Sequence, residues 1–155
     1  MGIGAGNLQK IPGFLFFDHV AISVKQGDLE NQVAAYQLMG FTEIHREDVR
    51  GKDLVREVLL RIGDGPNLIQ LLEPLSPESP VTKQIEKNGG RGGFAHIALR
   101  VADIHIAFDY LKRNGFHIID PAPRPGSRGT TVFFLHPKTT EAAALGYLVE
   151  VVQEG

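Results

Sequence analysis

The chain has 155 residues, of which 43% are hydrophobic and 22% are charged, and its formal net charge at pH 7 is −2. These values are typical of one globular domain, with no basic excess for binding nucleic acid and no apolar run near the ~20 residues that span a membrane. The sequence contains no cysteine, which excludes disulfide bonds and thiolate metal sites and fits a reducing, cytoplasmic location.

Residues 1–13 are expected to form an N-terminal arm, which lacks the basic and apolar regions of a signal peptide. The first half of the following domain is predicted to contain a strand, a helix and three more strands, over 14–24, 28–39, 41–46, 54–61 and 67–73. Asp28 is the expected N-cap of the helix, and Leu29 and Val33 begin its buried stripe.

A connector, residues 76–93, joins the two halves and carries a short predicted helix over 81–88. The second half repeats the order of the first, with predicted elements over 94–101, 104–114, 116–119, 130–135 and 146–152. Residues 120–126 contain three prolines and are interpreted as a loop.

An internal repeat is the most informative feature of the sequence. The segment FDHVAISV, which contains His19, is matched by FAHIALRV, which contains His96, and the two histidines are 77 residues apart. Each segment is followed by a helix-like stretch that ends at a Gly-Phe pair, Gly40-Phe41 or Gly115-Phe116. The repeat therefore predicts two modules of the same fold.

The predicted fold is α+β, with two tandem βαβββ modules over about 14–75 and 94–152 in a single domain, 14–152. Neither module buries the apolar face of its strands well alone. We expect the eight strands to form an open, cup-shaped sheet with the helices outside, so that alternate residues of each strand point into the cup.

Four polar residues occupy matching places in the two modules. Gln70 and Glu150 are each a lone polar residue in an apolar strand, 51 and 54 residues after His19 and His96. A buried amide costs about 1–3 kcal/mol when it lacks a partner, and a carboxylate costs more. One divalent cation would satisfy all four side chains, and two imidazoles, an amide oxygen and a carboxylate suit Zn²⁺, Co²⁺, Ni²⁺ or Mn²⁺.

Each of these residues also has an ordinary structural interpretation. A histidine at the start of a strand is commonly a hydrogen-bonded core or surface residue. Gln70 could face water from an edge strand, and Glu150 lies close to the C-terminus, where solvation is usual. Two further histidines, His45 and His117, follow the Gly-Phe pairs and are expected on exposed strands.

The chain resembles the methylmalonyl-CoA epimerase family of the vicinal oxygen chelate superfamily, which also contains glyoxalase I, extradiol dioxygenases and bleomycin-resistance proteins. The resemblance covers most of residues 17–152. It is carried by the segments DHVA (18–21), QLLEPL (70–75), GGFAHIA (92–98), PRPG (123–126) and FLHPK (134–138).

The resemblance implies that His19, Gln70, His96 and Glu150 bind the metal, and that Glu57 is an acid/base that works opposite Glu150. It also implies inversion at C2 of methylmalonyl-CoA by two-base proton transfer, a CoA thioester as the small-molecule ligand, and a homodimer. Without it, Glu57 would be interpreted as a solvated strand residue between Arg56 and Arg61.

Two departures from the family pattern concern the substrate more than the metal. Ala95 stands where the family usually has a histidine directly before the ligand His96, and the segment between His136 and Glu150 is about four residues longer than expected. The alternatives are a glyoxalase I-like isomerase or another metal-dependent member, and a metal-free binding or resistance protein. Gln70, as a fourth ligand, tilts the choice away from a dioxygenase, which normally uses two histidines and one carboxylate. It also tilts the choice away from glyoxalase I, which usually has a carboxylate on the strand that carries Gln70.

Overall fold

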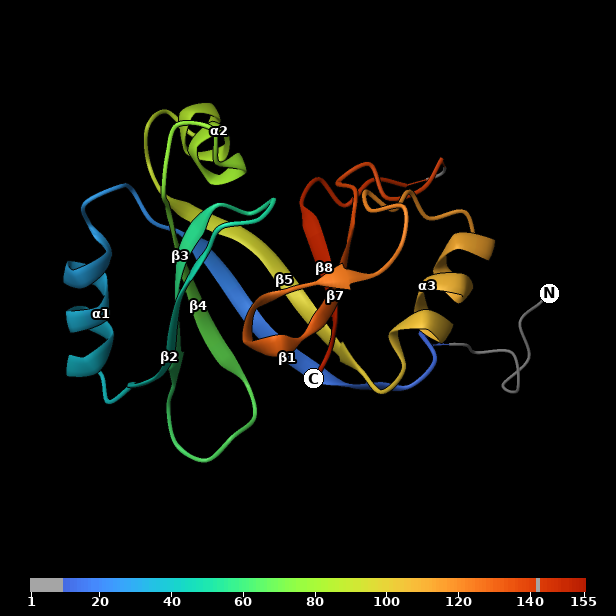
Figure 1. Cartoon of the computed structure of the whole chain (residues 1–155), viewed down its shortest axis with the longest axis horizontal. Coiled ribbons are helices and arrows are strands. Elements are labelled where there is room, and N and C mark those ends of the chain that lie inside the picture. The colour runs from blue at the N-terminus through green and yellow to red at the C-terminus, as the bar shows by residue number, and fades with distance from the viewer. Residues whose placement is uncertain (1–9, 142) are drawn as a thin grey trace. The chain divides into compact units, whose positions relative to one another are not determined.

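The computed structural model describes residues 10–141 and 143–155, so most of the predicted arm lies outside the described residues. The strands are β1 (Phe14–Ser23), β2 (Thr42–Val49), β3 (Val55–Arg61), β4 (Leu68–Pro74), β5 (Gly93–Val101), β6 (Arg124–Pro125), β7 (Thr131–Leu135) and β8 (Leu148–Gln153). The helices are α1 (Leu29–Leu38), α2 (Pro80–Lys87) and α3 (Ile104–Arg113), with a short 3₁₀ turn at Ser127–Gly129 (Figure 1).

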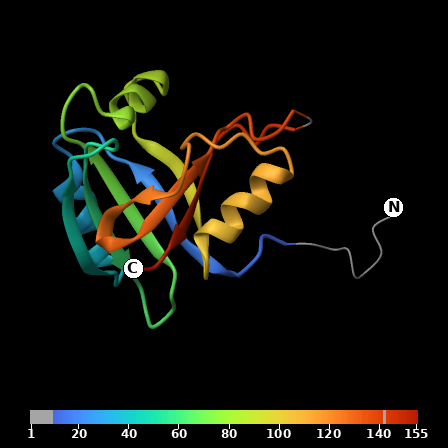
Figure 2. The same cartoon turned by 45° about the vertical axis from the view of Figure 1, so that its right-hand side comes forward.

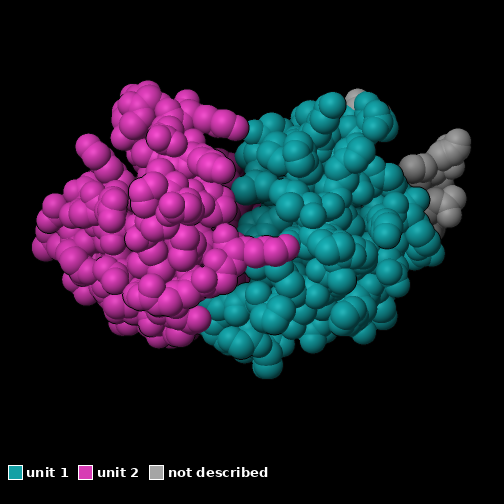
Figure 3. Space-filling model, turned by 45° about the horizontal axis from the view of Figure 1, so that its top comes forward, with its two compact units in different colours: residues 1–17, 99–155 teal, residues 18–98 magenta. Residues whose placement is uncertain are grey.

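The strands are hydrogen-bonded in the order β2-β3-β4-β1-β5-β8-β7-β6, as one mixed sheet of eight strands. This confirms the predicted α+β class and strand number, while the cup shape and the module boundaries stay predictions. Residues 18–98 form one compact unit (unit 2), and the described residues of 1–17 and 99–155 form the other (unit 1) (Figure 3). No helix in the described part of the chain has the length and apolar character needed to cross a bilayer.

In unit 2, one face of the sheet packs against α1. This face carries a buried apolar cluster drawn from α1, β3, β4 and the residue after β1: Val24, Leu29, Val33, Val58, Leu60 and Leu71. Figure 1 shows α1 lying along β2, β3 and β4. Because side chains alternate between the two faces of a strand, this cluster leaves the intervening residues for the opposite face.

The strand register defines that opposite face. β1 runs parallel to β4 with Ala21 opposite Gln70, and β3 runs antiparallel to β4 with Leu59 opposite Gln70. On the other side of β3, Glu57 lies opposite Glu47 of β2. Since partners in register project to the same side of a sheet, polar residues from all four strands share one face.

Helix α2 closes one end of this polar face. Val81 and Ile85 of α2 pack with Ala21, Val55 and Leu72 in a second buried apolar cluster. The helix begins where Ser79 Oγ accepts from Val81 N, with proline in the first turn. Both features favour a helix start at this point.

The carboxylate that caps the N-terminus of α1 differs from our expectation. Asp28 is the N-cap residue, but its side chain makes no capping hydrogen bond. Instead, the carboxylate of Glu73 accepts from Gly27 N at 2.7 Å and from Leu29 N at 3.3 Å. A carboxylate favours a helix N-terminus, and here it comes from β4, far away in the sequence. The predicted burial of Leu29 and Val33 is confirmed.

In unit 1, α3 packs on β7 and β8 (Figure 2). Phe108 and Phe133 form an edge-to-face pair with ring centroids 5.1 Å apart. Asp103 caps this helix as its side chain accepts from His105 N and Ile106 N. The amide of Ile104 donates to Gln153 Oε1 of β8, which fixes the helix start against the sheet.

The predicted strand over 116–119 is wrong. Only Ile118 forms an isolated bridge with β7, and the strand that pairs with β7 at this edge is β6, within the segment interpreted as a loop. Asp120 interrupts the first pairing because its carboxylate, not a backbone carbonyl, accepts from Phe134 N. The prolines at 121, 123 and 125 have no N–H to donate to a ladder, so pairing stays short.

Candidate metal centre and neighbouring carboxylate

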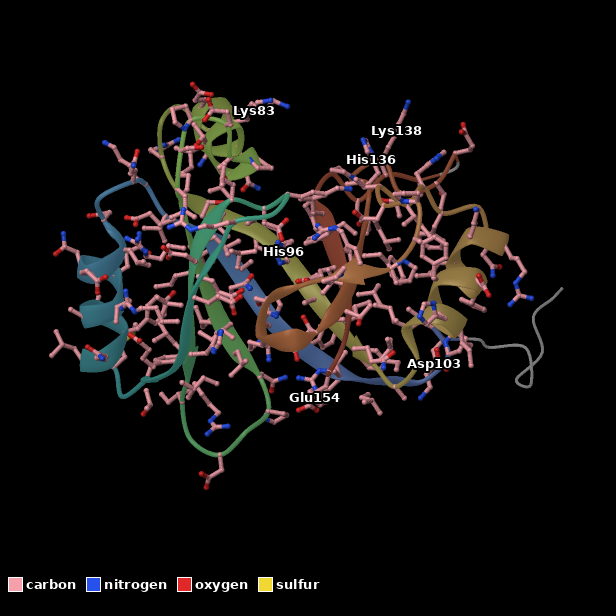
Figure 4. The ribbon with its side chains drawn as sticks, viewed as in Figure 1. Lys83, His96, Asp103, His136, Lys138 and Glu154 are labelled. Atoms are coloured by element: carbon pink, nitrogen blue, oxygen red, sulfur yellow. The ribbon has the colours of Figure 1, made fainter. Side chains whose placement is uncertain are left out.

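Two histidines from the repeated strands meet in unit 2. His19 is 3% exposed and His96 is 5% exposed, and their Nε2 atoms lie 3.2 Å apart. Figure 4 labels His96 on β5. The prediction that the repeat brings these two imidazoles together is thereby confirmed.

The tautomer of His19 is set by its sequence neighbour. His19 Nδ1 donates to Asp18 Oδ2 at 2.7 Å, and Asp18 is fully buried. A carboxylate on Nδ1 leaves the lone pair on Nε2, and metal-binding histidines commonly have one ring nitrogen held in this way. The adjacent pair Asp18-His19 carries this signal in the sequence, although the sequence-based prediction gives Asp18 no role.

The histidine pair fits a divalent metal ion. With metal–nitrogen distances of about 2.0–2.1 Å, two imidazole ligands of one ion lie roughly 2.9–3.4 Å apart for octahedral and tetrahedral angles. The observed separation of 3.2 Å between the two Nε2 atoms falls within this range. The residues present therefore fit such an ion.

Gln70 supplies a further oxygen of the right kind. It is 6% exposed in β4, and its Oε1 has no hydrogen-bond partner among the described residues. Leaving a buried amide oxygen without a partner costs about 1–3 kcal/mol, which a cation would offset. The interpretation of Gln70 as an edge-strand residue facing water is wrong, since β1 and β3 flank β4 on both sides.

The amide nitrogen of the same residue points to a carboxylate. Gln70 Nε2 donates to Glu57 Oε1, and this hydrogen bond fixes which end of the amide carries the unpartnered oxygen. Glu57 is 2% exposed, so its interpretation as a solvated strand residue is also wrong. Its burial places an ionisable group beside a candidate metal ligand.

Glu150 lies in unit 1, at the centre of β8. It is 8% exposed and pairs in register with Phe134 of β7. Because Glu150 is buried, its interpretation as a solvated residue near the C-terminus is wrong. Its role as a ligand and base stays a prediction, taken up below.

Ala95, which departs from the family pattern, belongs to the apolar cluster under α2 and is 4% exposed. Just before it, Gly92 allows a close approach of the chain to β1. A Cβ at this position would collide with the carbonyl oxygen of Ser23. Glycine here lets the His96 strand lie against the His19 strand.

Sequence reasoning missed His45, which it placed on an exposed strand. The structure shows it half-buried, with Nε2 2.8 Å from Glu47 Oε1 and 3.9 Å from Glu57 Oε2. The three side chains offer ligand or donor atoms within 4.8 Å of one another. Only the strand register, which sequence alone does not provide, brings His45 to the polar face. His117, by contrast, is exposed as predicted.

Charged residues on the α1 side of β2 and β3 pair among themselves. Arg56 Nε donates to Asp48 Oδ1 at 2.8 Å, and this hydrogen bond holds the pKa of Asp48 below its usual value. The same contact raises the pKa of Arg56. This pair is separate from the buried carboxylate of Glu57, which projects from the other face.

A sequence profile of the glyoxalase/bleomycin resistance protein/dioxygenase superfamily matches residues 18–134. The ethylmalonyl-CoA/methylmalonyl-CoA epimerase of Cereibacter sphaeroides is 36% identical over 138 residues, which are 88% of this chain and 96% of that protein. A mitochondrial methylmalonyl-CoA epimerase of Dictyostelium discoideum is 42% identical over 86 residues, 56% of this chain and 49% of that protein.

A solved structure of an epimerase is also similar to this chain. A variant of Streptomyces coelicolor methylmalonyl-CoA epimerase, in complex with 2-nitronate-propionyl-CoA, superposes with a TM-score of 0.80 at 33% identity, covering 92% of this chain and 99% of that one. With a profile match over most of its length and full-length relatives above 30% identity, the chain belongs to the glyoxalase/bleomycin resistance protein/dioxygenase superfamily.

Proposed function

We propose that this chain is a metal-dependent epimerase that inverts C2 of methylmalonyl-CoA. The observation that carries the proposal is the buried hydrogen bond between Glu57 and Gln70, on the sheet face that also bears His19. An acid/base carboxylate thus lies next to a candidate metal ligand. The relatives named above are epimerases of methylmalonyl-CoA, which supports the substrate class.

The proposed metal ligands are His19, Gln70, His96 and Glu150. Support for the first three comes from the 3.2 Å histidine pair and from the amide oxygen of Gln70, which has no hydrogen-bond partner within residues 10–141 and 143–155. Support for Glu150 comes from the repeat, since it occupies the place in the second module that Gln70 occupies in the first. This mixed set of nitrogen and oxygen donors suits Zn²⁺, Co²⁺, Ni²⁺ or Mn²⁺.

The reaction begins with the acidic proton at C2, which lies α to the thioester carbonyl. Glu57, as a carboxylate, removes this proton from one face of the carbon, and Glu150, which begins the step as the carboxylic acid, gives its own proton to the opposite face. Inversion requires one base on each face, and glutamates from the two modules provide them. In the reverse direction the two residues exchange roles.

A divalent ion, when bound, supplies positive charge near the thioester oxygen on which negative charge develops. The protein's own contribution is positioning. Asp18 fixes the ring of His19 through the 2.7 Å hydrogen bond, and Glu57 fixes the amide of Gln70. Because the donors are already oriented, they need little reorganisation during the reaction.

The ligand is proposed to be a small-molecule CoA thioester. The loop between β7 and β8 is held at its base, where Gly146 N donates to Pro137 O at 2.9 Å and Lys138 N to His136 Nδ1 at 2.9 Å. Figure 4 labels His136 and Lys138 in this loop. A homodimer and a cytoplasmic location stay predictions of the sequence.

The test is proton exchange at C2 of methylmalonyl-CoA in deuterated water, followed by NMR. The wild-type chain should wash out the C2 proton and interconvert the epimers. Glu57→Gln, which keeps the size of the side chain and removes the base, should slow interconversion of the epimers by about 100-fold or more while the metal content stays unchanged. Absence of exchange with the metal-loaded wild type would overturn the proposal. Interconversion at the wild-type rate by Glu57→Gln would remove Glu57 from the mechanism.

A further inference from the structure

We infer that His45 is a positioning residue that holds the Glu57 carboxylate in its working orientation, and the inference rests on the proposed function. His45 belongs to neither the proposed ligand set nor the pair of bases. It comes from β2, at the far side of β3 from the candidate metal ligand Gln70. It therefore acts on the reaction only through Glu57.

The register of β2 and β3 creates the need for such a residue. Glu47 and Glu57 are direct cross-strand partners, so two carboxylates project from the same face at neighbouring positions. Like charges directly opposite one another destabilise a strand pair. Left alone, the two carboxylates would turn apart, and Glu57 would lose its orientation.

His45 lies between these carboxylates. A register shift between Glu43 and His45 pairs His45 with Leu59 and Glu47 with Glu57, so both side chains project from the face of Glu57. Its Nε2 atom lies 2.8 Å from Glu47 Oε1 and 3.9 Å from Glu57 Oε2. The N–H edge of the imidazole thus binds Glu47 and presents a positive dipole to Glu57.

Each oxygen of the Glu57 carboxylate therefore has a polar side chain as its neighbour. Its Oε1 accepts from Gln70 Nε2, and its Oε2 faces His45 Nε2. Gln70, a candidate metal ligand, is the neighbour of Oε1. His45, whose side chain is 31% exposed, is the neighbour of Oε2. A misplacement of about 1 Å in such a group can cost about 100-fold in rate, so loss of one of the two contacts is expected to matter.

The variant His45→Ala should lower kcat for C2 exchange by about 10- to 100-fold, with KM changed by less than about threefold and metal content unchanged. His45→Gln keeps an N–H donor at similar reach and should recover part of the loss. His105→Ala, at an exposed histidine on α3, is the matched control and should behave as wild type.

A double-mutant cycle separates positioning from a general structural effect. In a Glu57→Asp background the carboxylate is one methylene shorter and withdrawn from His45, so His45→Ala should cost less than about threefold there. An equal fold loss in both backgrounds would overturn the inference, as would a wild-type kcat for His45→Ala. If the metal-loaded wild type fails to exchange C2, the proposed function and the inference both fall, whereas an active wild type with an unaffected His45→Ala overturns the inference alone.

Discussion

Gln70 donates through its amide nitrogen to Glu57, and this one hydrogen bond joins a buried carboxylate to a candidate metal ligand. The two residues come from adjacent strands, β4 and β3, and lie diagonally across the ladder, since Leu59 is the register partner of Gln70. The orientation of the amide and the orientation of the carboxylate are thus set together. Changes at Gln70 should therefore affect both metal binding and the orientation of Glu57.

Gln70→Glu should therefore lower kcat by about 10-fold or more. The new carboxylate would lie beside Glu57 with no N–H to donate, and two close carboxylates resist joint ionisation. Gln70→Ala should instead weaken metal binding with a smaller effect on Glu57. Steady-state exchange kinetics and metal titration of the two variants distinguish these effects, and equal kcat and metal affinity in both would contradict the coupling.

Asp18→Asn should weaken metal affinity about 10- to 100-fold, the usual cost of losing a carboxylate that holds the second nitrogen of a histidine ligand. The amide is nearly isosteric with the carboxylate, but it allows His19 to rotate or change tautomer. A chelator-competition titration measures the affinity. Asp64→Asn, in an exposed turn, is the control and should leave it unchanged. An unaltered affinity in Asp18→Asn would separate Asp18 from the site.

The repeat allowed the histidine pair to be predicted because the same strand pattern recurs with the same polar position. Gln70 and Glu57 are both buried, although the local pattern alone favours a solvated Glu57. The predicted helices and most strands agree with the structure within a few residues. Alternating apolar residues and turn residues are local signals, so the elements that they predict depend little on long-range contacts.

Other features depend on contacts that no local pattern records. His45 reaches the polar face through a register shift between β2 and β3. The carboxylate that holds the start of α1 is Glu73, 44 residues from Leu29. The edge pairing of β6 follows from a side-chain hydrogen bond of Asp120, which displaces the predicted strand at 116–119. In each case a long-range contact decides between local alternatives.

Gly92→Ala should destabilise the fold by about 2–4 kcal/mol, because the added Cβ collides with the Ser23 carbonyl rather than with a flexible side chain. The relief of this clash moves the start of β5, so His96 should also lose metal affinity. Gly65→Ala is the matched control, since a Cβ there meets nothing within 4 Å. Urea unfolding of the two variants checks the difference, and similar stabilities would show that the backbone adjusts freely.

Asp48→Asn should reduce stability at neutral pH but not in acid. The hydrogen bond from Arg56 holds the pKa of Asp48 below the usual 3.8, so the folded state favours the charged carboxylate. A depressed pKa contributes stability above the unfolded value, and this contribution disappears as pH falls through the folded value.

Urea unfolding of wild type and Asp48→Asn from pH 7 to pH 2 provides the measurement. The difference in free energy of unfolding should be constant down to about pH 5 and should shrink to zero at the acidic end. Arg56→Gln, which removes the other partner, should lose the same pH-dependent component. A difference that stays constant down to pH 2 would show that Asp48 stabilises the strand pair without its charge, through packing or a neutral hydrogen bond.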